Sequence, residues 1–242
     1  SLAALAAVAG FGLAAPAFAD TFADYSATDS SSNIKWTDAA GTGTLTAFPA
    51  GGAEIYFSFL LPSLSAFKNL QADFTITGVS TNPATGTSFL TEGGIGGTFN
   101  FTYDGPNKVL DGIHLNTGDS LLSGTFANAA LTGPNGGQSG AVLGDANSLG
   151  PITYANSKFI TYDPTGNKSI GIEMTSIINP LHIAADGQIG SFKAVSTGSF
   201  SSGILGTGGG GTPEPATWAL MLIGVGGIGA MARRQSKAAL AT

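Results

Sequence analysis

The chain has 242 residues, no cysteine and a formal net charge of −6, and charged side chains make up only 10% of it. The lack of cysteine excludes disulfide bonds, thiolate metal sites and cysteine nucleophiles. Residues 20–211 contain six lysines, no arginine and fourteen acidic residues, which leaves this region at −8. We do not expect such a region to bind nucleic acid, because it cannot neutralise the phosphates.

Residues 1–19 have the composition of a secretory signal peptide. Leu2–Ala15 is an uncharged run rich in alanine and leucine. Ala17 and Ala19 place small residues before Asp20, as at a signal peptidase site of the Ala-x-Ala type. We therefore predict a signal-peptide helix that is removed between Ala19 and Asp20. The basic n-region is missing and the first residue is serine, so we expect this signal to be truncated at its start.

A β-rich exported domain is predicted for residues 20–204. Its many glycine, serine, threonine and phenylalanine residues favour strands and turns over helices. Apolar residues take every second position in Leu70–Thr77, Phe99–Tyr103 and Ile170–Met174, which is the period of a half-buried strand. Further strand candidates are Glu54–Leu61, Val109–Leu115, Leu121–Leu131, Ile152–Tyr162 and Ile189–Phe200.

Clusters of turn-forming residues separate these segments. They supply proline to fix φ, or glycine, asparagine and aspartate to adopt positive φ. Short strands between such turns predict an all-β domain, either an antiparallel β-sandwich or an open barrel. A short helical turn is expected near Pro62–Asn69. The clusters are Thr81–Gly86, Asp104–Asn107, Gly133–Gly137 and Asp163–Asn167.

The domain offers weak signals for a catalytic, cofactor or metal site. His114 and His182, the only histidines, have apolar neighbours, and we interpret both as partly buried and hydrogen-bonded. Asp104–Asn107 and Asp163–Asn167 lack the closely spaced oxygens that calcium needs, so Asx-turns are expected. Gly93–Gly97 has the glycine content of a phosphate-binding loop but no Walker lysine, so we expect a hairpin loop. No catalytic, metal-ligating or cofactor-binding residue is therefore predicted.

Two alternative functions stay open for this domain. A carbohydrate-binding module would stack exposed aromatic rings on sugars, and Tyr25, Trp36 and Tyr154 lie among polar residues. A polysaccharide-active enzyme would need two carboxylates across a cleft, about 5–9.5 Å apart. The acidic residues are scattered, and their spacing pairs none of them; examples are Glu54, Glu92, Asp111 and Glu173.

The C-terminal region has three consecutive parts. Residues 205–212 form a glycine-rich linker, and the Pro-Glu-Pro triplet of residues 213–215 prevents a helix from extending backwards. Residues 216–232 are uncharged and would span roughly 25 Å as a helix, near the lower limit for crossing a bilayer. Arg233 and Arg234 follow at once, which places the C-terminus in the cytoplasm by the positive-inside rule. A single transmembrane helix is therefore predicted.

This tail resembles the PEP-CTERM sorting signal of Gram-negative, exopolysaccharide-producing bacteria. The resemblance covers about residues 212–237, assigns the signal to 213–237 and leaves 238–242 as a short extension. It implies a transient partner, an exosortase, which is a membrane cysteine transpeptidase that cuts near the Pro-Glu-Pro triplet. An ordinary C-terminal membrane anchor is the alternative interpretation. The residues that carry the resemblance are Pro213, Glu214, Pro215, Trp218, Ala219, Arg233 and Arg234.

The two terminal signals predict export across the inner membrane, transient anchoring through the C-terminal helix, and then release to the cell surface or the medium. We expect a non-enzymatic surface or extracellular-matrix protein, associated with biofilm, with exopolysaccharide as a candidate partner. Carbohydrate binding by a dedicated module is the first alternative, and enzymatic action on a polysaccharide is the second.

Overall fold

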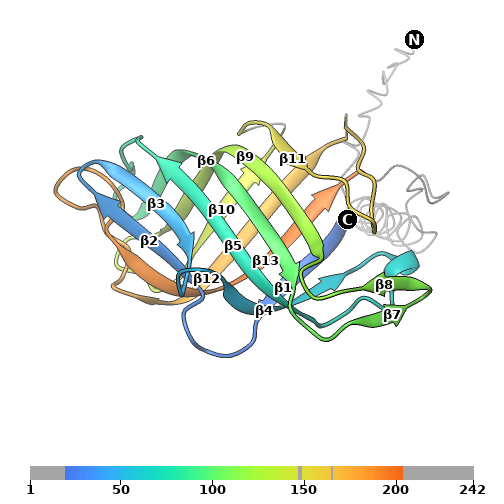
Figure 1. Cartoon of the computed structure of the whole chain (residues 1–242). Coiled ribbons are helices and arrows are strands. Elements are labelled where there is room, and N and C mark those ends of the chain that lie inside the picture. The colour runs from blue at the N-terminus through green and yellow to red at the C-terminus, as the bar shows by residue number, and fades with distance from the viewer. Residues whose placement is uncertain (1–19, 147–148, 165, 204–242) are drawn as a thin grey trace, which may run out of the picture. The chain divides into compact units, whose positions relative to one another are not determined.

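The computed structural model describes residues 20–146, 149–164 and 166–203. This part of the chain is all-β, as predicted, and its one helix is the short 3-10 helix η1 (Pro62–Leu64), where a helical turn was expected (Figure 1). The strands are β1 (Thr21–Ala27), β2 (Ile34–Ala39), β3 (Thr42–Ala47), β4 (Ala53–Phe59), β5 (Leu70–Ser80), β6 (Phe89–Tyr103), β7 (Lys108–Leu110), β8 (Ile113–Leu115), β9 (Ser120–Pro134), β10 (Gly140–Asp145), β11 (Ile152–Tyr154), β12 (Lys168–Ile178) and β13 (Phe192–Ser202).

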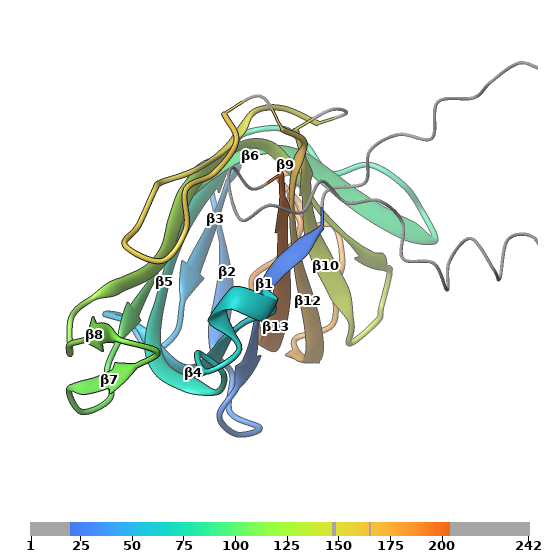
Figure 2. The same ribbon diagram turned by 90° about the vertical axis from the view of Figure 1, so that its right-hand side faces the viewer.

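The long strands pair side by side in a ring that returns to its start. All neighbours are antiparallel, in the order β5, β6, β9, β10, β12, β13, β1, β4 and back to β5. Toward the other ends of β13 and β5, the β2–β3 hairpin bridges the same interval. The sheet is therefore a closed barrel, seen from two directions in Figure 1 and Figure 2, whereas the sequence suggested a sandwich or an open barrel.

The closure depends on strands that the sequence pattern did not reveal. Residues Ala23–Tyr25 of β1 pair with β4 along one edge and with β13 along the other. The segments 21–27, 34–39 and 42–47 mix threonine, alanine, aspartate and glycine with few large apolar residues, so their alternation is weak. Without them, the remaining predicted strands leave a gap, and the sheet looks open.

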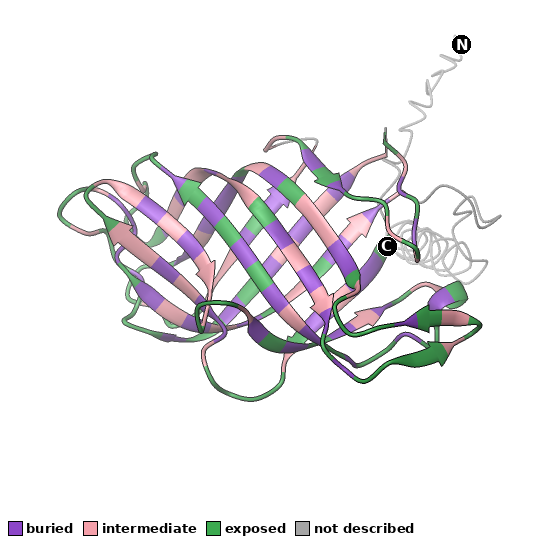
Figure 3. Cartoon of the chain, viewed as in Figure 1, coloured by how far each residue is buried: buried purple, intermediate pink, exposed green. Residues whose placement is uncertain are grey.

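Aromatic side chains fill the interior of the barrel. Buried and exposed residues alternate along the strands, as the stripes in Figure 3 show, so one face of each strand points inward. Phe101 lies at the centre of this cluster and is fully buried. Its ring centroid lies 4.8–6.2 Å from those of Tyr25, Phe57, Phe74, Phe99 and Phe200.

Three local predictions were wrong. The segment 109–115 is a hairpin of β7 and β8, because Asp111 and Gly112 adopt positive φ and reverse the chain. The segment 152–162 is a strand only over β11 and continues as a loop. Gly93–Gly97 lies within β6 and is no hairpin loop. At Gly97 a Cβ would lie 1.8 Å from the carbonyl oxygen of Thr77, so only glycine lets these strands approach.

Truncating the central ring should destabilise the barrel strongly. We expect Phe101→Ala to lower the free energy of unfolding by about 3–5 kcal/mol, because it removes buried contacts and leaves a cavity. Phe89→Ala on the same strand is the matched control, since Phe89 is 57% exposed and should cost less than about 1 kcal/mol. Urea denaturation of both variants measures the difference, and equal losses would contradict this description of the core.

Candidate functional site

The sorting and processing residues lie at or beyond the limits of the described structure. Asp20, the residue after the predicted signal peptidase cut, is exposed at the start of the described chain. Within the described ranges, no helix is long and apolar enough to cross a membrane. The following lie outside the described residues: Ala17, Ala19, Pro213, Glu214, Pro215, Trp218, Ala219, Arg233, Arg234 and the predicted helix 216–232.

The aromatic residues that the carbohydrate-binding alternative would need for sugar stacking are buried, so their rings are not available to a sugar. Tyr25, Trp36 and Tyr154 are 2%, 0% and 7% exposed. Tyr25 Oη is 2.9 Å from Ser196 Oγ inside the barrel, and Tyr154 Oη donates a hydrogen bond to the Ser169 carbonyl. Burial raises the pKa of both tyrosines. Their polar sequence neighbours do not expose these rings, because neighbouring side chains in a strand point to opposite faces.

The two histidines are also placed differently from the prediction. His114 and His182 are both exposed, and only His182 has its ring nitrogen near a carbonyl of the described chain, with Nδ1 2.9 Å from the oxygen of Pro180. His114 lies in the short β8 strand of the β7–β8 hairpin, which is a separate two-stranded sheet. The hairpin is too small to bury both of its faces, which explains why His114 is exposed.

The four acids taken from the sequence lie on four separate elements of the described chain, namely β4, β6, the β7–β8 turn and β12. Glu54 on β4 pairs across the strands with Asp73, while Glu173 on β12 is exposed between Ala141 and Thr197. Asp111 lies in the exposed turn of the β7–β8 hairpin. Among the described residues, no group of three or more histidine or acidic side chains is arranged to hold a metal ion.

Glu92, the fourth of these acids, holds a loop instead. Its side chain is fully buried, and its Oε2 accepts a 2.6 Å hydrogen bond from the backbone N–H of Ile189. The Ile189 carbonyl in turn accepts a 2.8 Å hydrogen bond from the indole Nε1 of Trp36. Ile189 belongs to the loop of residues 179–191 between β12 and β13. Glu92 on β6 and Trp36 on β2 thus bind the backbone N–H and the backbone carbonyl of the same residue.

The electrostatics around Glu92 are unfavourable at neutral pH. The pKa of Glu92 is raised to about 7, chiefly by burial and to a smaller extent by the nearby Asp38 and Asp186, while the Ile189 N–H and Ser80 oppose the shift. Burial and Asp186 also raise the pKa of Asp38. Backbone N–H groups of Gly41 and Gln188 lower the pKa of Asp186. Within the described structure, Glu92 Oε1 and Asp38 Oδ1 are buried without a hydrogen-bond partner.

The barrel should therefore lose stability as the pH rises from about 4.5 to about 7. In this window the folded state keeps the Glu92 proton and the unfolded state, with its ordinary pKa of 4.5, does not. Glu92→Gln should remove this slope and stabilise the protein at pH 8 by about 1–2 kcal/mol. Urea denaturation at pH 5 and pH 8 measures this change in stability, and Glu173→Gln, at an exposed position on β12, is the control. A Glu92→Gln variant that keeps the wild-type pH slope would refute the assignment.

A second arrangement, which sequence reasoning missed, lies on the outer surface of β5, β6, β9 and β11. Thr77, Thr98, Thr125 and Thr153 are successive cross-strand partners and form one row across all four strands. Thr75, Asn100 and Ser123 form a parallel row two residues away. All seven are exposed or half-buried, and we call them the neutral face. Each segment has polar residues in alternate positions, but only the register brings them into rows.

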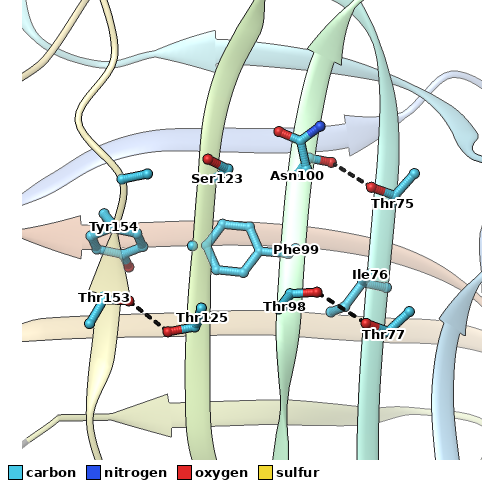
Figure 4. A pocket seen from close by; sticks show the side chains of 12 residues that line it. Thr75, Ile76, Thr77, Thr98, Phe99, Asn100, Ser123, Thr125, Thr153 and Tyr154 are labelled. Carbon is cyan, nitrogen blue, oxygen red and sulfur yellow. Dashed lines mark hydrogen bonds between the residues drawn. The ribbon is translucent and has the colours of Figure 1, made fainter.

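The neutral face lines a shallow depression of about 380 Å³ (Figure 4). Thr77 and Thr98 hydroxyls lie 3.1 Å apart, and those of Thr125 and Thr153 lie 2.6 Å apart, so adjacent strands exchange hydrogen bonds within the row. The remaining lining residues are Ile76, Phe99, Gly124, Tyr154 and Ala155, so no charged side chain of the described chain lines the depression. Such a surface can donate and accept hydrogen bonds but offers no acid, base or nucleophile pair.

Comparison with known proteins identifies the tail rather than the barrel. Residues 212–235 match the PEP-CTERM protein-sorting motif, which confirms the resemblance seen in the sequence. The motif implies export, processing by an exosortase and membrane-associated sorting. Comparisons with curated proteins and with solved structures gave no match.

Proposed function

We propose that this chain is a non-enzymatic protein of the cell surface or extracellular matrix, associated with exopolysaccharide, which an exosortase processes after export. The observation that carries the proposal is the PEP-CTERM sorting motif at residues 212–235. The predicted signal peptide at residues 1–19 supplies the matching route across the inner membrane. The barrel is then the delivered cargo, and the tail is its transient anchor.

The packing and the charge of the barrel support a structural or binding role. Aromatic rings fill its interior, so recognition falls to its outer surface and its ends. Glu92, the carboxyl group with the most strongly raised pKa among the described acids, is engaged with the Ile189 backbone and fully buried. A net charge of −8 over residues 20–211 favours solubility outside the cell. Each of these features suits a stable exported domain better than a catalyst.

The sorting proposal predicts a specific processed mass. In cells with the exosortase, the mature protein should begin at Asp20 and end near the Pro-Glu-Pro triplet, and in cells without it the tail should stay attached. Replacing Pro213, Glu214 and Pro215 with alanine should also leave the tail attached and keep the protein in the membrane fraction. Intact-mass spectrometry of the membrane fraction and the medium measures both effects.

The matched control replaces Gly208, Gly209 and Gly210 with alanine, which changes the linker and leaves the motif intact. This variant should be processed like the wild type. If residues 216–242 stay attached in both strains, the tail is an ordinary membrane anchor and the proposal fails.

A further inference from the structure

The register of four strands builds the neutral face. Direct cross-strand pairing puts Thr77, Thr98, Thr125 and Thr153 in line, perpendicular to β5, β6, β9 and β11. Neighbouring strands lie about 4.8 Å apart, so this row is roughly 14 Å long. The row of Thr75, Asn100 and Ser123 lies about 7 Å from it along the strands. The result is a two-row array of polar groups on a rigid sheet, not on a loop.

Internal hydrogen bonds fix the orientation of the polar groups. Asn100 Oδ1 accepts a 2.9 Å hydrogen bond from Ser120, and its Nδ2 donates a 2.7 Å hydrogen bond to Thr102. An amide has a second N–H and a second lone pair, and a threonine hydroxyl has one donor and two acceptor sites. The array therefore keeps donor and acceptor capacity for a ligand while its side chains are already oriented, which lowers the entropy cost of binding.

The charge distribution selects the class of ligand. The described lining of the depression has no charged residue, while residues 20–211 carry −8. An anionic polymer would be repelled by the domain and would find no cation among these lining residues. A neutral ligand meets neither obstacle. Hydroxyl groups of a ligand can both donate to and accept from the threonine hydroxyls, and the threonine methyl groups give apolar contact to a sugar ring.

We propose that the neutral face binds a segment of an uncharged polysaccharide, lying along the threonine row across β5, β6, β9 and β11. This deepens the proposed surface or matrix function and rests on it. The depression of about 380 Å³ is at the small end of ligand sites, which suits a few sugar units of a longer chain. Binding here uses hydrogen bonds and threonine methyl groups and needs no exposed aromatic ring.

Isosteric removal of two central hydroxyl groups tests the proposal. The full exported chain is run in native gels that contain dextran, hydroxyethyl cellulose or alginate, and retardation gives the apparent Kd. We expect retardation by at least one of the two neutral glucans and none by alginate. Thr98→Val together with Thr125→Val should weaken that binding roughly tenfold, because two hydrogen bonds are lost.

The matched control is Thr175→Val together with Thr197→Val, which removes two exposed strand hydroxyls on β12 and β13. This control should bind like the wild type, and circular dichroism should show that both double variants fold. The proposal is overturned if neither neutral glucan retards the wild type, if alginate binds as well, or if both double variants lose affinity equally. Processing of the tail, measured by mass in the same preparations, decides separately whether the proposed sorting function holds.

Discussion

The described domain depends on β1, which pairs along both of its edges. Ala23–Tyr25 joins β4 to β13 and so turns an open sheet into a ring. The approach of β13 requires Gly198 opposite Tyr25, because a Cβ there would lie 2.4 Å from the tyrosine ring. The Tyr25 hydroxyl then meets Ser196 within the barrel. Closure removes free edges along this part of the wall and with them a route to edge-to-edge aggregation.

Closure of the barrel also limits the surfaces on which the protein can bind a ligand. A ring of strands has one inner and one outer face, and the inner face here is filled by the rings around Phe101. Aromatic contacts of this kind add about 0.5–1.5 kcal/mol per pair beyond the area that they bury. The packed interior thus stabilises the barrel, while the depression lined by the neutral face lies on its outer side. The hydrogen bond from the Ile189 N–H to Glu92 fixes the 179–191 loop, but burying this acid lowers the stability of the fold at neutral pH.

The sequence predicted those features that depend on local pattern. Alternation located β5, β6 and β12, the further strand candidates covered β4, β9 and β13, and turn residues marked most of the connections between them. The sequence did not reveal β1, whose pattern is weak, or β10, which joins β9 to β12, so closure was missed. The same limit explains the sites. Alternation alone places Tyr154 in the interior, because Thr153 and Ala155 point outward. The threonine row could not be predicted in this way, because it needs the pairing of β9 with β11, which brings together Thr125 and Thr153, 28 positions apart.

The sorting signal of the tail and the neutral face of the barrel are therefore encoded in the sequence in different ways. A sorting signal is read as a short linear segment, so it can be recognised from residues 212–235 alone. The neutral face has no linear signature, because its residues come from four strands and are aligned only by register. A slip of one residue between β6 and β9 would turn Thr125 toward the aromatic core and Phe126 toward solvent. The core that resists this slip is consequently also what holds the outer hydroxyl row in line.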